Sequence, residues 1–155
     1  MERIRRAGSQ FVEGSLLEEQ DVGFRVLSVD DSNLSDILRT PDELKQDELA
    51  LYTSSLKADR TDEDLLFQVL LDWGLDLAAP VASESLAERT VFVADDGALI
   101  ACFADAVSVE VVSAIAERQP LRAVFRDSAF ETDADRINAE QIFRERSPGT
   151  ELKAI

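Results

Sequence analysis

The sequence predicts an α/β protein in which helices pack on a mixed sheet that contains a hairpin. Three observations carry this prediction. From residue 90 onward the chain reads strand, strand, helix, strand, helix, strand, an alternation typical of α/β layers. An Asp-Gly pair separates the first two apolar runs, as in a hairpin turn. Before residue 80 the apolar spacing is mostly helical, which predicts a helical insert in the N-terminal half.

The first 30 residues predict one helix, a polar linker and one strand. Residues 2–11 have apolar side chains seven positions apart and form the only basic segment, so we expect a short helix there. Residues 14–21 are polar and are interpreted as a linker. In residues 23–29 apolar and polar side chains alternate, which favours a strand with one buried face.

Two further helices are predicted before the sheet. Thr40 can cap the first, which is expected to extend to about residue 56. Thr61 opens the second, whose acidic first turn suits the positive end of the helix dipole. This helix is nearly apolar all round up to Gly74, so we expect it to be buried on more than one side or to contact another chain. Its candidate interaction residues are Phe67, Leu71 and Trp73.

Three apolar runs and a short segment after the turn at residues 147–150 predict the strands of the sheet. Residues 90–94 and 98–103 flank Asp95-Asp96-Gly97 and form the predicted hairpin. Residues 121–125 are apolar except for one Arg, which indicates a central strand. Residues 151–155 are expected to form a short last strand.

Two helices separate these later strands. Ser108 is expected to cap the first, which extends to Arg118 before Pro120 stops it. Thr132, with Asp135 three residues later, is expected to cap the second, which extends to about residue 146.

Charge narrows the classes of partner. The 155 residues include 16 basic and 32 acidic side chains, a formal net charge of −16. Such a surface repels DNA and anionic lipid within a Debye length of about 8–10 Å, so neither is an expected partner of this chain alone. The charge either keeps the protein soluble or complements a basic partner. No apolar run is long enough to cross a bilayer, and no signal peptide is recognisable, so we expect a cytoplasmic protein.

The residue types that most enzymes need are scarce. Histidine is absent, and the single cysteine, Cys102, lies in an apolar run, so we interpret it as a small buried hydrophobe. The chain has no phosphate-binding or dinucleotide-binding glycine motif and no Gly-x-Ser-x-Gly elbow. Acidic residues 62–64 and 95–96 could gather a cation, but a capped helix and a hairpin turn account for them more simply. We therefore expect no catalytic, cofactor-binding or metal-binding residue.

The best candidate site on physical grounds is Arg126-Asp127-Ser128. These residues follow the predicted central strand, and ligands of open α/β sheets favour the carboxyl ends of strands. The alternative is that Arg126 and Asp127 pair with neighbouring side chains and join the strand end to the next helix. No base or nucleophile accompanies them, so we expect a structural or interaction role.

Several stretches that stay in order and cover nearly the whole chain carry a resemblance. They are residues 2–8 (ERIRRAG), 23–27 (GFRVL), 31–33 (DSN), 60–70 (RTDEDLLFQVL), 97–103 (GALIACF), 123–128 (AVFRDS) and 141–143 (QIF). Together they resemble the C-terminal part of the modification subunit of type III restriction-modification systems. Such subunits are site-specific DNA methyltransferases that act on N6 of adenine.

The resemblance implies a part of such an enzyme without its catalytic machinery. The family's Asp-Pro-Pro-Tyr motif and the Phe-x-Gly-x-Gly motif that holds S-adenosylmethionine are absent from the chain. On this resemblance, residues 1–20 are a trailing helix and linker from the preceding catalytic domain, and residues 21–155 are a C-terminal α/β domain. No catalytic or cofactor residue is carried over, because the missing parts of the full-length protein would bind S-adenosylmethionine and DNA.

The resemblance also implies a role in assembly. In such systems the modification subunit dimerises and associates with a restriction subunit, so a non-catalytic C-terminal domain would serve dimerisation or docking. Two alternatives stay open. The chain could be a small carboxylate-based metal-binding or enzymatic domain that uses Arg126 and Asp127. It could also be a free-standing acidic interaction protein or DNA mimic.

Overall fold

A computed structural model describes residues 2–13, 23–33, 56–57 and 59–155 of the chain. The chain divides into two compact units, Met1–Asp31 and Ser32–Ile155, and each is described by itself. Nearly all of the helix predicted from Thr40, and the linker predicted over residues 14–21, lie outside the described residues.

The first unit contains helix α1 (Glu2–Glu13), which confirms the predicted N-terminal helix. Arg6 and Glu2, one helical turn apart, form an ion pair on its exposed surface, with 3.0 Å between Arg6 Nε and Glu2 Oε1. Such a pair stabilises a helix slightly. The strand predicted over residues 23–29 is wrong, because residues 23–31 form neither helix nor strand. Val26 and Val29 are exposed, and alternation stabilises a strand only where a neighbouring strand and a core cover one face.

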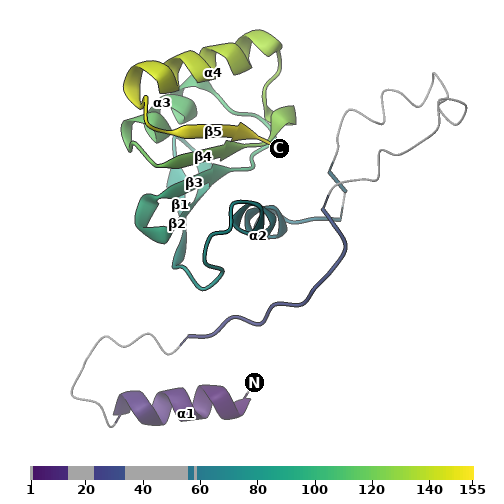
Figure 1. The fold of residues 1–155 in the computed structure, drawn as a ribbon, viewed down its shortest axis with the longest axis vertical. Helices are drawn as coiled ribbons and strands as arrows, with labels where there is room; N and C mark the ends of the chain where they lie inside the picture. The colour runs from purple at the N-terminus through teal and green to yellow at the C-terminus, as the bar shows by residue number, and fades with distance from the viewer. Residues whose placement is uncertain (1, 14–22, 34–55, 58) are drawn as a thin grey trace, which may run out of the picture. The chain divides into compact units, whose positions relative to one another are not determined.

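The second unit is built on a five-stranded mixed sheet in the order β1-β2-β3-β4-β5 (Figure 1). β2 pairs antiparallel with both β1 and β3, whereas β4 pairs parallel with both β3 and β5. This sheet confirms the predicted α/β class and the predicted order from residue 90 onward. The strands are β1 (Val81–Leu86), β2 (Arg89–Ala94), β3 (Leu99–Cys102), β4 (Arg122–Phe125) and β5 (Glu151–Ala154).

The first strand is the element that the sequence pattern missed. β1 is an edge strand, with β2 as its one neighbour in the sheet. It therefore tolerates several polar residues, including Ser83, Glu84 and Ser85. The turn into β2 uses Ala87 and Glu88 with φ of 47° and 64°, without the Gly or Asn that normally marks such a turn. The second hairpin is as predicted, with a single 3-10 turn at η3 (Asp95–Gly97) between β2 and β3.

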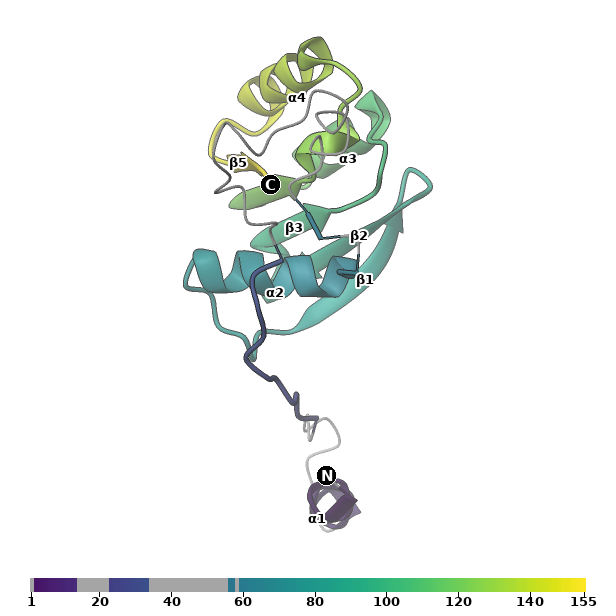
Figure 2. The same cartoon turned by 90° about the vertical axis from the view of Figure 1, so that its right-hand side faces the viewer.

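Helices cover both faces of the sheet (Figures 1 and 2). Helix α2 (Asp62–Asp72) buries Leu65, Leu66, Val69 and Leu70 against one face. Helices α3 (Val109–Glu117) and α4 (Asp133–Arg146) cover the other face, where Cys102 is fully buried. Burial raises the pKa of the Cys102 thiol, which agrees with its interpretation as a core hydrophobe.

The predicted helix ends are confirmed at α2 and α4, whereas Ser108 holds the N-cap position of α3 without the expected side-chain capping bond. Thr61 and Asp64 form a reciprocal capping box at α2, and Thr132 and Asp135 form another at α4. Gly74 ends α2 in the left-handed conformation, with φ of 63°. The Leu75 amide then donates to the Leu70 carbonyl at 2.8 Å, which satisfies one of the last carbonyls of the helix.

Candidate functional site

Arg126 lies at the carboxyl end of β4 and joins three elements. Its Nη1 donates to Asp105 Oδ1 at 2.5 Å, and its Nη2 lies 3.5 Å from Asp62 Oδ1. Asp105 belongs to the loop after β3, and Asp62 is the first residue of α2. The Arg126 side chain is only 19% exposed, and its Nε is buried without an acceptor among the described residues. The guanidinium is therefore held between two carboxylates near the carboxyl ends of β3 and β4.

The same cluster changes the acidity of Asp62. Partial burial is the main cause that raises the pKa of the Asp62 carboxyl above its ordinary value. The positive charge of Arg126 acts in the opposite direction, and the negative charge of Asp105 adds to the increase. Desolvation therefore outweighs the ion pair at this position.

Asp127 and Ser128 do not converge with Arg126 on a common point. The Asp127 carboxylate accepts a hydrogen bond from Arg136 Nη1 of α4 at 3.0 Å, and the Asp127 amide donates to the Ile155 carbonyl at 2.8 Å. Ser128 is exposed in the short turn η4 (Asp127–Ala129). The three residues predicted as one candidate site thus serve separate contacts. The geometry agrees with the alternative interpretation, in which charged pairs join the strand end to neighbouring elements.

The three candidate interaction residues of α2 are also separated. Phe67 is half-buried against the core on the α2 side of the sheet. Leu71, one turn later, is 63% exposed. Trp73 instead lies beside the sheet, over the side chains of β4 and β5. The nearly apolar surface of α2 is therefore explained mostly by its packing on the sheet, with Leu71 as the exception.

Trp73 is the centre of a small cluster of charged side chains. Arg122 Cζ lies 5.1 Å and Lys153 Nζ lies 5.5 Å from its ring centroid, distances at which cations are attracted to an aromatic face. Arg122 pairs with Glu151 at 3.4 Å, and Lys153 pairs with Asp72 at 3.6 Å. We call these five residues the Trp73 patch. The patch consists of a half-buried Trp with two cations and two carboxylates around it.

The described residues give no sign of a metal centre. Among them, no group of three or more His, Cys, Asp or Glu side chains could hold a metal ion. Asp95 and Asp96 belong to the turn η3, and Asp62 and Asp64 belong to the first turn of α2. Within the same part of the chain, every helix is too short or too polar to cross a membrane.

Comparison with known proteins identifies no relative. No protein-family model, no curated protein and no solved structure matches this chain. The likeness to type III modification subunits is therefore a prediction from the residues quoted above.

Sequence reasoning missed most of the partners in both clusters. Asp105 lies in a short loop, and Arg122 and Lys153 lie within apparently ordinary strands. A signal existed for Arg122, because it is the only charge in the otherwise apolar strand β4. Lys153 had none, because β5 also contains Glu151 on the same face. No local signal marked Asp105, since its contact with Arg126 depends on the parallel pairing of β3 with β4.

Proposed function

We propose that this chain is a non-catalytic assembly module, the C-terminal domain of a DNA adenine-N6 methyltransferase of a type III restriction-modification system. In this proposal it serves dimerisation or docking of the restriction subunit, and S-adenosylmethionine and DNA are bound by other parts of the full-length protein. The sequence resemblance supports the family. The geometry supports the assembly role.

The observation that carries the assembly role is the Trp73 patch. Trp and Arg are among the residue types most enriched in the energetically dominant contacts of protein interfaces. Here Trp73 is half-buried beside Arg122 and Lys153, on the part of the sheet face next to α2. A partner that covers the ring would remove water from two ion pairs at once. This increases the attraction within each pair and costs hydration of the charges, so such a surface favours a partner with complementary charges.

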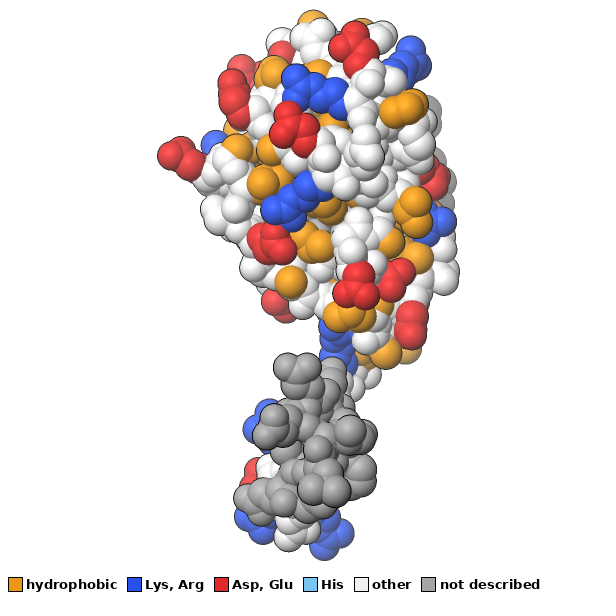
Figure 3. Space-filling model, turned by 90° about the vertical axis from the view of Figure 1, so that its left-hand side faces the viewer, with side chains coloured by type: hydrophobic (Ala, Val, Ile, Leu, Met, Phe, Trp, Pro, Cys, Tyr) orange, Lys and Arg blue, Asp and Glu red, His pale blue; other side chains and the backbone are white. Residues whose placement is uncertain are grey.

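The face of the folded unit shown in Figure 3 favours a protein partner over a DNA-mimic role. On the face shown in Figure 3, acidic and basic side chains lie interspersed with hydrophobic ones. A surface that competes with DNA would instead present carboxylates in rows at the spacing of phosphates. The mixed surface is typical of the rim of a protein–protein interface.

Binding experiments with the full chain test this proposal. Light scattering measures self-association, and a pull-down with the restriction subunit of a type III system encoded in the same genome measures docking. We expect association in at least one experiment. Absence of association in both would contradict the assembly role. Docking to the restriction subunit would in addition support the family.

A further inference from the structure

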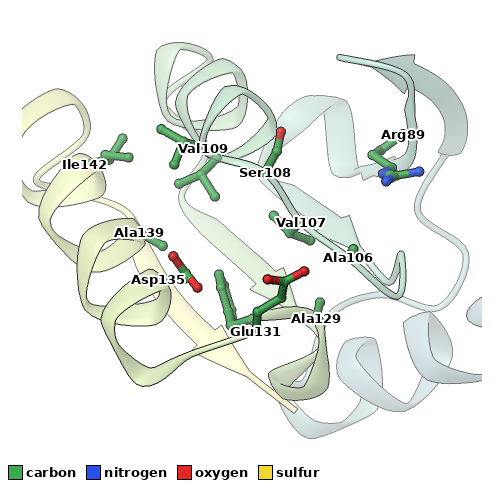
Figure 4. A pocket seen from close by; sticks show the side chains of 12 residues that line it. Arg89, Ala106, Val107, Ser108, Val109, Ala129, Glu131, Asp135, Ala139 and Ile142 are labelled. Atoms are coloured by element: carbon green, nitrogen blue, oxygen red, sulfur yellow. The ribbon is translucent and has the colours of Figure 1, made fainter.

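A groove separates the N-terminal ends of α3 and α4, near the carboxyl ends of β3 and β4 (Figure 4). Its volume is about 280 Å³, enough for one long side chain but not for a folded element. The walls are mainly apolar and come from the loop before α3, from η4 and from the first turns of both helices. The apolar lining residues include Val107, Val112, Ala129, Phe130, Ala139 and Ile142.

Two carboxylates in this groove lack a cation. Glu131 forms no hydrogen bond or ion pair with any described residue, and Asp135 uses only its Oδ2 atom to accept from Thr132. The one basic side chain of the lining, Arg89, lies well apart from both carboxylates (Figure 4). The groove therefore combines apolar walls with two carboxylates that have no basic side chain as a partner among the described residues.

The N-terminus of α3 does not attract an anion to this groove. The Ser108 hydroxyl near the Glu110 carboxylate lowers the pKa of Glu110 below its ordinary value. A carboxylate is thus already present at the positive end of the helix. An anionic ligand would meet this charge together with Glu131 and Asp135.

We propose that the groove binds a lysine or arginine side chain of a partner protein. The aliphatic part of such a side chain would pack against the apolar walls, and its charged end would reach Glu131 and Asp135. Phe130 also lines the groove, and an aromatic ring attracts a cation that lies over its face. The net charge of −16 attracts basic segments toward the whole molecule. This groove is separate from the Trp73 patch, so the two proposals can fail independently.

Titration of the full chain with short peptides tests the proposal. The probes are the blocked peptides acetyl-Leu-Lys-Leu-amide and acetyl-Leu-Arg-Leu-amide, with norleucine and glutamate peptides of the same form as matched probes. Amide chemical shifts report the site of binding. We expect the two basic peptides to shift the resonances of Val107, Val112 and Ile142, and the other two to bind at least fivefold more weakly.

Three variants locate the charge and the cavity. Glu131→Lys reverses the free carboxylate and is expected to weaken the lysine peptide about five- to tenfold. Glu145→Lys makes the same change on the exposed surface of α4, outside the groove, and serves as the control. Ala106→Phe fills the groove from an exposed lining position, so it is expected to abolish binding without disturbing the core.

Four outcomes would overturn the proposal. The first is the absence of resonance shifts in the groove with either basic peptide. The second is equal weakening by Glu131→Lys and Glu145→Lys, which would indicate attraction by net charge alone. The third is equally tight binding of the norleucine peptide, which would leave an apolar groove without preference for a cation. The fourth is preferential binding of the glutamate peptide, which would assign the site to Arg89.

Discussion

Arg126 at the end of β4 donates a hydrogen bond to Asp105 after β3 over 2.5 Å. The same guanidinium reaches Asp62 at the start of α2, at 3.5 Å. Arg126 thus connects two parallel strands of the sheet to the helix that covers one of its faces. Asp127, the next residue, makes the equivalent connection to α4 on the other face through Arg136.

Arg126→Ala is expected to lower the free energy of unfolding by about 1–2 kcal/mol. The loss combines a charge-assisted hydrogen bond with the packing of the buried aliphatic part of the side chain. Both acidic partners keep access to water, since the side chains of Asp105 and Asp62 are 95% and 45% exposed, and this limits the effect. Urea denaturation measures it. Arg144→Ala on the exposed surface of α4 is the control, with an expected change within about 0.5 kcal/mol; equal effects of the two variants would contradict the structural role.

Asp62→Asn is expected to change how stability depends on pH. Burial raises the pKa of Asp62 in the folded state, so the folded protein holds this proton at a higher pH than the unfolded chain does. Ionisation of Asp62 therefore lowers the free energy of unfolding as pH rises from the ordinary carboxyl range through the raised pKa. Asn removes this contribution, so the variant gains stability relative to the wild type over that interval.

A matched variant separates this effect from loss of a helix-terminal charge. Asp133 holds the same first position in α4 that Asp62 holds in α2, and it is exposed. Denaturation curves between pH 3 and pH 7 compare the two Asn variants. If both variants gained the same stability relative to the wild type as pH rises, burial of Asp62 beside Arg126 would not be the cause.

The two capping boxes predict the same loss of stability for equivalent substitutions in α2 and α4. Thr61→Ala and Thr132→Ala are each expected to lower the free energy of unfolding by about 1 kcal/mol, because each leaves a backbone amide of the first helical turn unsatisfied. Serine keeps the hydroxyl, so Thr61→Ser and Thr132→Ser are expected to retain most of the stability. Denaturant midpoints measure all four variants. An Ala variant as stable as its Ser counterpart would argue against the capping bond.

Substitutions at three glycines distinguish the effect of backbone strain from the effect of steric crowding. None of Gly74, Gly97 and Gly149 has an atom within 4 Å of an added Cβ, but only Gly74 and Gly97 have positive φ, at 63° and 93°. Gly74→Ala and Gly97→Ala are therefore expected to cost about 1–2 kcal/mol each. Gly149→Ala is expected to be neutral or to stabilise by up to about 1 kcal/mol, through the unfolded chain. Thermal melts in which Gly149→Ala loses as much stability as the other two variants would contradict this expectation.

Elements with local signals could be predicted from the sequence. The caps at Thr61 and Thr132, the end of α2 at Gly74 and the turn at Asp95 to Gly97 all depend on residues within one turn of each other. β1 had no such signal, because an edge strand with one neighbour tolerates polar residues and its turn contains no glycine. The strand predicted over residues 23–29 failed for the opposite reason, since its alternation has no partner strand among the described residues.

The candidate site was predictable only in part. The position of Arg126 at a strand end followed from the apolar run before it. Its partners did not, because Asp62 and Asp105 come from a helix start and a loop that only the parallel pairing of β3 with β4 and the packing of α2 bring together. The Trp73 patch likewise combines α2, β4 and β5, so Arg122 and Lys153 could not be assigned to Trp73 from the sequence.

The central claim is that this chain associates with a protein partner through the Trp73 patch. The most direct measurement compares the association of the wild type, Lys153→Glu and Arg144→Glu, by light scattering alone and by pull-down with the restriction subunit. We predict association of the wild type and of Arg144→Glu, and association at least about tenfold weaker for Lys153→Glu, whose charge reversal lies beside Trp73. Equal association of the two variants, or no association of the wild type in either experiment, would contradict the account.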